Sequence, residues 1–504
     1  MTERVLVVGA GMAGLFTALA LGAAGWRVDV LERDPPAPDG GADDAFENWS
    51  RRGVGHLRHS HAFLARLRRV ISDNHPGLLD DLRAAGVQEL NFFDGLTTHA
   101  REKYRPMPED SQLTVLTSRR TTLELVMRRY VERMNSVRIH SGVNVVGLVG
   151  EVDEEGRFVC RGLTLEDAAG RRDELADIVV DGAGRLSQTF EWLEEAGVRV
   201  AEESEDAGIL YYTRHWRLRP GQEEPPRGGP PGAGDIGFIK YGVFPADNGC
   251  FSITLAVPEI EETLRQAVMR PEIFERICQK IPGVARWTDP DRAEPISKVF
   301  GMGDLKSRWR DTVTDGRPAA LNLFVVGDGL VRTNPLYGRG CSFAAVEAHL
   351  LRDVLAAHTR PAARAVAYRN SVQTELRPFY DGMLFQDRQA IKRARQTLTG
   401  DQQPGLKALM ARSFANDALT PALRSDPALL REFMRGFHML EPSNDWLKRP
   451  ANIAKVLKVW AMPKPAKAKH YPPRLGPRRP EMFEALGLSA TADAERLGLA
   501  PAGP

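Results

Sequence analysis

The stretch Val5-Leu-Val-Val-Gly9-Ala-Gly11-Met-Ala-Gly14 near the start of the chain decides its fold. An apolar run of strand length leads into three glycines spaced Gly-x-Gly-x-x-Gly, and the Ala- and Leu-rich segment 12–24 has helical character. Residues 27–31 form a second strand-like run, which ends at Glu32. Strand, glycine turn, helix and strand in this order predict a βαβ unit with a nucleotide-binding turn at its first corner.

Each glycine of this turn has a physical role. Gly9 permits the tight turn, Gly11 lets a pyrophosphate approach the backbone, and Gly14 lets the helix lie close to the strand. The free N–H groups at the start of the helix, around Met12 and Ala13, then face the phosphates. The turn is therefore expected to bind a dinucleotide.

Glu32 indicates which dinucleotide. It lies 18 residues after Gly14, where a carboxylate can accept hydrogen bonds from both hydroxyl groups of an adenosine ribose. An acid at this position disfavours a 2′-phosphate, so the sequence predicts FAD or NAD rather than NADP. The adjacent Arg33 is an expected cofactor contact.

The run 5–25 contains no charged residue, so a signal peptide or a membrane span is an alternative for it. Its five glycines and the spacing to Glu32 fit a nucleotide turn better than a lipid-facing helix. No other stretch is long and apolar enough to cross a bilayer. We therefore expect a soluble protein.

Composition excludes several classes of protein. The 504 residues suffice for more than one domain, and the formal net charge of +2 predicts no general affinity for nucleic acid. The four cysteines are scattered and form no Cys-x-x-Cys pair. This distribution argues against a zinc site or a disulfide framework, and it predicts a cytoplasmic location.

A second motif follows far along the chain. An apolar strand ends at Gly327-Asp328-Gly329, the loop Asn334-Pro-Leu-Tyr-Gly338-Arg-Gly340 comes next, and an apolar helix is expected over 342–351. The N-terminus of this helix would stabilise a nearby negative charge. The order strand, Gly-Asp, proline loop and helix is what the edge of a flavin needs.

Between these motifs the chain is rich in strand-like runs. Residues 121–135 have helical spacing, and short strands are expected over 143–149, 158–165 and 178–180; the last leads into Asp181-Gly182. Residues 208–220 and 236–257 are β-branched and aromatic, with partial alternation. From residue 362 onward the pattern is mostly helical, and it ends in a tail rich in proline and basic residues.

Together these segments make a family resemblance visible. The chain resembles the single-component flavoprotein monooxygenases with the para-hydroxybenzoate hydroxylase fold, and especially the bacterial epoxidases and hydroxylases that act on apolar secondary metabolites. The resemblance covers roughly residues 1–370. The resemblance rests on five segments. They are the glycine turn with Glu32, the Asp-Gly motif, the Gly-Asp motif with its proline loop, the helix start Ser118-Arg119-Arg120-Thr-Thr-Leu123-Glu124, and the Arg- and His-containing stretch 52–61.

The sequence departs from the family pattern at three places, one of which, Gly329 instead of the usual small Ala, is harmless. Gln188-Thr189-Phe190 follows the Asp-Gly motif where the family often has Arg or Pro after its Ser. Because the family uses this motif for both FAD and the nicotinamide, the departure puts the electron donor in doubt. Cys341-Ser342 stands where many members carry Asn.

The resemblance implies an α/β fold. We expect a Rossmann-like FAD-binding domain of the glutathione-reductase type (residues 1–200 and 295–370), an inserted, mostly antiparallel β-sheet substrate domain (201–294), and a helical C-terminal region with a basic tail (371–504). The residues expected to bind FAD are Gly9, Gly11, Met12, Ala13, Gly14, Glu32, Arg33, Arg52, Arg120, Asp181, Gly182, Gly327, Asp328, Pro335, Gly338, Gly340, Cys341 and Ser342. No metal ligand set is expected.

By the same resemblance, the chemistry resides in the flavin. NAD(P)H reduces FAD, O2 adds to it, and the resulting C4a-hydroperoxide hydroxylates or epoxidises an apolar small molecule. The loop Pro335, Leu336, Tyr337 and Gly338 is expected at the isoalloxazine ring. No second Gly-x-Gly-x-x-Gly motif follows a strand, so a separate NAD(P)H domain is not expected.

Alternative functions remain open from the sequence. A flavin-dependent reductase of prenyl chains would saturate alkenes without O2, and a non-redox isomerase or cyclase would hold FAD as a structural cofactor. A flavin-dependent halogenase is disfavoured because the signature Trp-x-Trp-x-Ile-Pro is absent.

Several features have two interpretations. The histidines at 56, 59 and 61 either line the site or lie in a solvated loop. Arg119 and Arg120 begin a helix, and they either lie near an anion such as the FAD pyrophosphate or form a solvated helix end. The aromatic residues of the inserted sheet form either its core or the floor of a substrate cavity: Tyr211, Tyr212, Trp216, Phe238, Tyr241 and Phe244. The basic helix 453–460 either packs on the body, which we favour, or makes a weak contact with a membrane surface.

Overall fold

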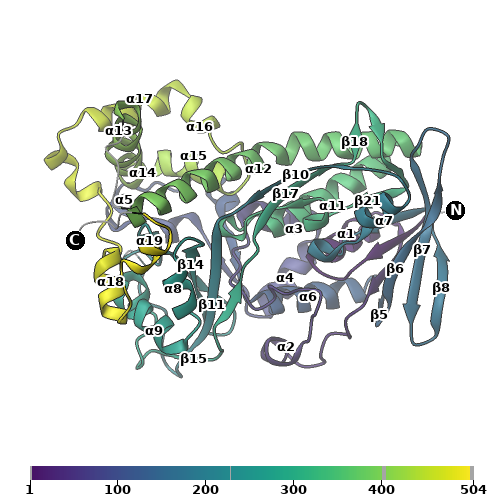
Figure 1. The fold of residues 1–504 in the computed structure, drawn as a ribbon, viewed down its shortest axis with the longest axis horizontal. Helices are drawn as coiled ribbons and strands as arrows, with labels where there is room; N and C mark the ends of the chain where they lie inside the picture. Colours follow the sequence, from purple (N-terminus) through teal and green to yellow (C-terminus); the bar gives the residue numbers. More distant parts are fainter. Residues whose placement is uncertain (1–2, 228, 400–404, 500–504) are drawn as a thin grey trace.

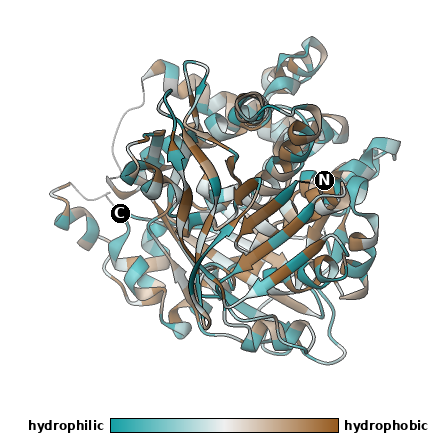
Figure 2. Cartoon of the chain, turned by 90° about the vertical axis from the view of Figure 1, so that its right-hand side faces the viewer, coloured by the Kyte–Doolittle hydropathy of each residue, from teal (hydrophilic) through white to brown (hydrophobic). Residues whose placement is uncertain are grey.

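The computed structural model describes residues 3–227, 229–399 and 405–499. A five-stranded parallel sheet forms the centre of the half that the sequence predicts to bind FAD, named the FAD-binding half for that reason. The strand order is β21-β9-β1-β2-β5, and Figure 2 shows its apolar strands in the interior. The strands are β1 (Arg4–Val8), β2 (Arg27–Glu32), β5 (Val137–Ser141), β9 (Ile178–Asp181) and β21 (Leu323–Val325). The pairing of β21 with β9 brings the distal motif beside the first one, as predicted.

Helix α1 (Met12–Ala23) explains why its sequence carries no charge. It is buried along almost its whole length and packs against α11 (Gly340–Ala357) and α6 (Arg120–Glu132). An apolar helix buried all round needs no polar face. Among the described residues, no helix combines the length and the apolar character that a membrane span requires.

Two smaller sheets extend the FAD-binding half. One contains β6 (Asn144–Val152), β7 (Phe158–Asp167), β8 (Gly170–Leu175) and β20 (Ala320–Leu321). The other contains β10 (Ala201–Asp206), β17 (Lys306–Asp311) and β22 (Val331–Arg332), and β10 and β17 are the two antiparallel connections to the inserted domain. Figure 1 shows this pair running across the molecule.

The inserted domain is an antiparallel sheet, as predicted. Its order is β12-β13-β14-β11-β15, with β16 also paired to β11. The strands are β11 (Ile209–Leu218), β12 (Ala233–Asp235), β13 (Lys240–Pro245), β14 (Cys250–Pro258), β15 (Ala293–Pro295) and β16 (Phe300–Met302). Because β16 lies after residue 294, the sheet extends past the predicted boundary there; the domain limits remain a prediction.

The two faces of the inserted sheet follow the alternation of its strands. Tyr212 and Trp216 belong to the apolar core that the sheet forms with its helices, whereas Tyr211 and Thr213 face the opposite side. The helices of this domain are α8 (Glu262–Ala267), α9 (Pro271–Lys280) and α10 (Pro282–Ala285). The sheet therefore has one face closed by helices and one turned toward the FAD-binding half.

The C-terminal region is helical and begins with the 39-residue α12 (Pro361–Thr399), which spans both halves (Figure 1). A small cluster of helices follows: α13 (Leu406–Ser413), α14 (Thr420–Ser425), α15 (Pro427–Phe437), α16 (Asp445–Lys448) and α17 (Pro450–Ala461). Helix α18 (Arg479–Leu486) then returns to the inserted domain and packs on α9. This last part of the described chain thus packs on the inserted domain.

The predicted basic helix and the start of the tail pack on other helices of the C-terminal region. Val456 of α17 is fully buried, and Trp460 packs beside Phe414. Lys467 is 1% exposed, and its ammonium donates hydrogen bonds to three backbone carbonyls, which satisfies the charge within the protein. Contact of this region with a membrane surface stays a prediction.

Short elements connect these layers. They are α2 (Ala42–Asn48), α3 (Ala65–Asn74), α4 (Pro76–Ala84), β3 (Gln88–Leu90), α5 (Thr98–Lys103), β4 (Val115–Thr117), α7 (Thr189–Glu195), β18 (Val313–Thr314), β19 (Arg317–Pro318) and α19 (Ala492–Arg496).

Candidate cofactor and substrate site

The glycine turn between β1 and α1 leaves space where a phosphate would lie. Gly9 has φ +86°, and a Cβ on Gly14 would lie 1.7 Å from the Gly9 carbonyl oxygen, so both positions need glycine. A Cβ on Gly11 would meet no protein atom within 4 Å. The glycine at 11 is thus not required by the protein's own packing, and the open space beside it fits a pyrophosphate.

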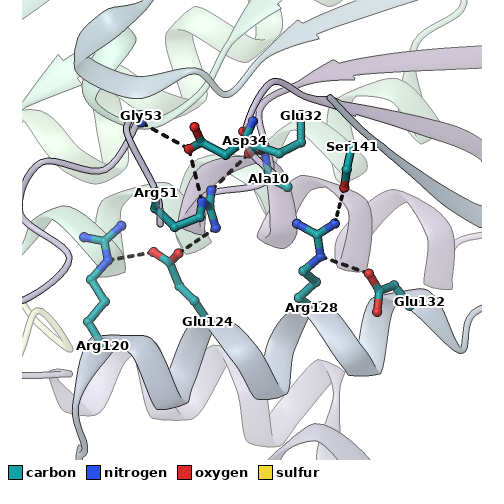
Figure 3. A network of polar contacts seen from close by, with 10 residues as sticks. All are labelled: Ala10, Glu32, Asp34, Arg51, Gly53, Arg120, Glu124, Arg128, Glu132 and Ser141. Carbon is teal, nitrogen blue, oxygen red and sulfur yellow. Dashed lines mark hydrogen bonds and ion pairs between the residues drawn. The ribbon is translucent and has the colours of Figure 1, made fainter. Parts of the chain in front are cut away.

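Glu32 is held in place at the end of β2 by a buried network (Figure 3). Its carboxylate accepts hydrogen bonds from the backbone N–H of Ala10 at 2.7 Å and of Asp34 at 2.8 Å, and from Arg51 at 3.0 Å. Arg51 also pairs with Glu124 at 3.1 Å. A carboxylate oriented in this way has a fixed position for binding a ribose.

Sequence reasoning chose Arg52, whereas the structure places its neighbour Arg51 in the network. Arg52 is exposed and lines neither of the two cavities described below. Arg51 is buried against the Trp49 ring, 5.0 Å from the ring centroid. Two adjacent arginines in a loop give no periodic signal that would distinguish the inward from the outward one. Arg33 is exposed and borders the smaller cavity.

The two arginines at the start of α6 have different partners. Arg119 forms a buried ion pair with Asp247 of the inserted domain at 2.6 Å, which joins the two domains. Arg120 donates to Glu124 at 2.7 Å and lies 3.1 Å from His61 Nε2, and it lines the larger cavity. Arg120 is therefore the arginine that can reach an anion in the cavity.

The Asp-Gly motif braces the glycine turn. Asp181 accepts hydrogen bonds from the Ala183 N–H at 2.8 Å, from the Thr189 hydroxyl at 2.7 Å and from the Ser187 hydroxyl. A Cβ on Gly182 would lie 2.8 Å from the Gly14 nitrogen. Thr189, where the sequence departs from the family, thus helps to hold the buried Asp181, whose pKa is raised by desolvation.

The Gly-Asp motif presents a carboxylate to the larger cavity. Gly327 has φ +78°, and its N–H donates to Glu347 of α11. Asp328 lines the cavity and has no hydrogen-bond partner among the described residues. Burial raises the pKa of Asp328, and the positive charges of Arg332, Arg120 and Arg185 act in the opposite direction. An acceptor in this position fits a hydroxyl-bearing ligand.

Helix α12 fixes the loop that follows. Asn334 accepts from the Tyr211 hydroxyl at 2.8 Å and donates to Asp387 of α12 at 2.8 Å. The Tyr337 hydroxyl donates to the same Asp387 oxygen at 2.9 Å. Gly338 has φ +62°, and a Cβ there would lie 3.1 Å from the Ala62 carbonyl oxygen. The loop is therefore rigidly attached to two distant elements.

Two adjoining cavities bring these motifs together. The smaller, about 100 Å³, contains Glu32 and Asp181, and the larger, about 510 Å³, contains Arg120 and Asp328. Gly11, Gly53, Val54, Gly182 and Ala183 line both. The result is an elongated site that fits an extended dinucleotide such as FAD, with further space at one end.

Most of the predicted contacts border this site. The larger cavity is lined by Gly11, Met12, Ala13, Arg120, Gly182, Gly327, Asp328, Pro335, Leu336, Tyr337, Gly338, Gly340 and Cys341. The smaller one is lined by Gly9, Gly11, Glu32, Arg33, Asp181 and Gly182. Gly14, Ser342 and Arg52 line neither. Gly14 serves the packing of the turn, and Ser342 is fully buried in α11.

The far end of the larger cavity is the open face of the inserted sheet. Tyr211 and Phe244 line it, whereas Tyr212, Trp216, Phe238 and Tyr241 belong to the domain core, and Tyr241 also borders the cavity. The strand alternation thus assigns some of the predicted aromatic residues to the domain core and others to the cavity wall. The C-terminal helices contribute Gln386 and Phe437, which sequence reasoning missed because no motif marks them.

The three histidines of the loop 56–61 all line the larger cavity. His59 Nδ1 lies 3.0 Å from the Thr213 hydroxyl. Burial lowers the pKa of His59 to about 4, and it lowers the pKa values of His56 and His61 well below their usual range. These side chains are therefore neutral at neutral pH. No three His, Cys, Asp or Glu side chains are grouped to hold a metal ion in the described part of the chain.

Comparisons with known proteins agree with this geometry. The profile of the family "DAO: FAD dependent oxidoreductase" matches residues 4–353. No curated protein sequence matches. The fold is similar to that of the myxobacterial chondrochloren halogenase CndH, with 16% identity, a TM-score of 0.58, and coverage of 89% of this chain and 97% of that one.

Two further solved structures share the fold. The anhydrotetracycline hydroxylase OxyS from Streptomyces rimosus has 17% identity and a TM-score of 0.53, over 87% of this chain and 76% of that one. PqsL, a probable FAD-dependent monooxygenase from Pseudomonas aeruginosa, has 18% identity and a TM-score of 0.53, over 79% of this chain and 100% of that one. At such identities the likeness concerns the fold alone. The family profile, in contrast, matches most of the chain and shows family membership. This chain belongs to the FAD-dependent oxidoreductases.

Proposed function

We propose that the protein is a monooxygenase that uses FAD, NAD(P)H and O2 to hydroxylate or epoxidise an apolar small molecule. The observation that carries the proposal is the shape of the site. The larger cavity continues from Asp328 past the loop 335–338 to the aromatic and hydroxyl-bearing face of the inserted sheet. A site of this shape can hold a flavin and a substrate together. The named activities of OxyS and PqsL are consistent with it.

The residues present would hold FAD along the whole site. Gly11 and the first N–H groups of α1, at Met12 and Ala13, would bind the pyrophosphate, and Arg120 would balance its charge. Glu32 would bind the ribose, and Asp328 a hydroxyl of the ribityl chain. The isoalloxazine would then be bordered by the remaining cavity-lining residues of the second motif: Pro335, Leu336, Tyr337, Gly338, Gly340 and Cys341.

When bound, FAD supplies the redox chemistry, in which two electrons from NAD(P)H and one O2 yield one oxygen atom for the product and one for water. The protein's own tasks are to orient the substrate and to limit water. Tyr211 and Tyr337 line the cavity at the loop, and their hydroxyl groups donate hydrogen bonds to Asn334 and Asp387. Their fixed positions give the substrate a preformed apolar wall.

The electron donor would reach the flavin through the same site. Arg185, two residues beyond Ala183 in the Asp-Gly motif, lines the larger cavity and has no ion-pair partner within the described residues. A cation there is suited to the phosphates of NAD(P)H. If NAD(P)H binds there, a separate nicotinamide-binding domain is not needed.

The test is oxygen incorporation. FAD-loaded protein is incubated with NAD(P)H, ¹⁸O2 and a panel of apolar arenes and alkenes, and products are analysed by mass spectrometry. The proposal predicts one ¹⁸O atom per product molecule and NAD(P)H oxidation that the substrate stimulates. Alkene reduction without O2 would instead identify a prenyl-chain-type reductase and would overturn the proposal.

A non-redox role is the second candidate. The fold is also similar to that of PyrE3, described as a Diels-Alderase, with 15% identity and a TM-score of 0.55. Product formation that requires neither NAD(P)H nor O2, and that adds no oxygen, would favour this candidate over a monooxygenase.

A further inference from the structure

The cavity face of the inserted sheet is a regular array of side chains. In register across β11, β14 and β13 lie the row Tyr211, Ala256 and Lys240 and the row Thr213, Thr254 and Gly242. All six residues line the larger cavity. Ala256 in the middle of the first row is small, and Tyr211 and Lys240 stand at opposite ends of that row. The Phe244 ring covers Gly242, where a Cβ would lie 2.7 Å from it.

Lys240 is an unpaired cation in this wall. It is half-buried, and it makes no hydrogen bond or ion pair within the described residues. The charged groups that face it are Asp235 on the paired strand, and Asp387 and Arg393 on α12. None of them lies within ion-pair distance of its ammonium group.

The position of Lys240 relative to the loop follows from the sheet. Tyr211 donates its hydroxyl to Asn334, so its end of the row touches the loop 334–338. Lys240 is two strands away, about 10 Å at the usual spacing of paired strands. From that position its ammonium group faces Asp387, the carboxylate that holds the loop, so Lys240 borders the same substrate space as the loop.

From this geometry we propose that the substrate is an apolar molecule that carries one anionic oxygen group, a carboxylate or an acidic phenol or enol, and that Lys240 binds this group. This inference rests on the proposed function, because it assumes that the loop borders the flavin. A partly buried cation without a counter-ion is costly, and an anionic ligand would offset that cost. Burial lowers the pKa of Lys240, because the ammonium group is partly desolvated and no ion pair within the protein compensates for this.

The experiment compares two probes that differ only in charge, 2-naphthoate and 2-naphthamide. Their dissociation constants are measured by calorimetry on FAD-loaded wild type, Lys240→Met and Lys240→Arg. Lys392→Met, which removes an exposed lysine of α12, is the control for the change in net charge. FAD content is recorded for each sample from its visible absorption.

The proposal predicts that wild type binds the acid at least about tenfold more tightly than the amide. Lys240→Met loses this preference, Lys240→Arg retains most of it, and Lys392→Met equals wild type. A wild type without the preference, or a Lys240→Met variant that keeps it, would overturn the proposal. The binding measurement does not depend on turnover. A preference for the acid, combined with no oxygen incorporation, would therefore contradict the proposed monooxygenase function but not the role of Lys240.

Discussion

The two ends of the elongated site are built in different ways. At the proposed nucleotide end, one continuous segment supplies β1, the glycine turn and α1, and Glu32 follows at the end of β2. At the proposed flavin and substrate end, the loop 334–338 is held by β11 and α12, and Gln386 and Phe437 come from the C-terminal helices. The first end depends on local backbone geometry, and the second depends on long-range side-chain contacts. A substitution at one end should therefore change the function of that end and leave the other end largely unaffected.

The largest expected effect is that of Gly11→Asp at the nucleotide end. Its carboxylate would meet the pyrophosphate, and an uncompensated buried charge costs about 3 kcal/mol or more, so FAD binding should weaken by roughly a hundredfold or more. Visible absorption of the purified protein measures this. Gly11→Ala is the matched control, because its Cβ meets no protein atom. A fully loaded, yellow Gly11→Asp protein would contradict the assignment.

Asp387→Ala should affect only the other end. It removes the acceptor that holds Asn334 and Tyr337, and a loop displaced by about 1 Å can reduce turnover by roughly a hundredfold. The FAD dissociation constant should remain within about threefold of wild type. Asp387→Asn keeps an acceptor oxygen and should preserve most of the activity. If Asp387→Ala instead lost FAD, the two ends would not be separable.

Asp328→Ala tests the junction of the two ends. A hydrogen bond from a ribityl hydroxyl to this carboxylate is worth about 2 kcal/mol, so FAD should bind roughly thirtyfold more weakly. The apoprotein should unfold at the same temperature or slightly higher, since Asp328 has no partner among the described residues. Titration of apoprotein with FAD and a thermal melt check the two statements. An unchanged dissociation constant would count against this role.

The smallest effect concerns the domain interface beside the substrate end. His59 has a pKa of about 4 in the folded protein, below the unfolded value of about 6.5. The neutral ring is favoured by folding, so its stabilisation is full above the unfolded pKa and is lost as the pH falls toward 4. Between about pH 8 and pH 6 the loss is about 1 kcal/mol. His59→Gln should show a smaller pH dependence in thermal melts; an equal dependence would exclude His59 as the cause.

The backbone fold of the proposed nucleotide end could be predicted nearly completely from the sequence. The strands, the helix and the glycine spacing are encoded within residues 5–32, and backbone sterics fix their geometry. Asp328 and the loop 335–338 were also recognisable, because strand, Gly-Asp and proline follow one another directly.

The substrate end was predicted only in part. Lys240, Gln386 and Asp387 reach the site through the pairing of β13 with β14 and the path of α12, and neither leaves a local pattern. The choice of Arg52 over Arg51 and the division of the aromatic residues depended on side-chain direction at positions where the sequence does not determine it.

The most direct measurement is the visible spectrum of the FAD-loaded protein, taken without oxygen before and after NADPH and again after air is admitted. Our account predicts one FAD per chain, bleaching of the flavin bands by NADPH and their return in air. A protein that holds no flavin even when FAD is supplied would contradict the central claim that both cavities together form one FAD site.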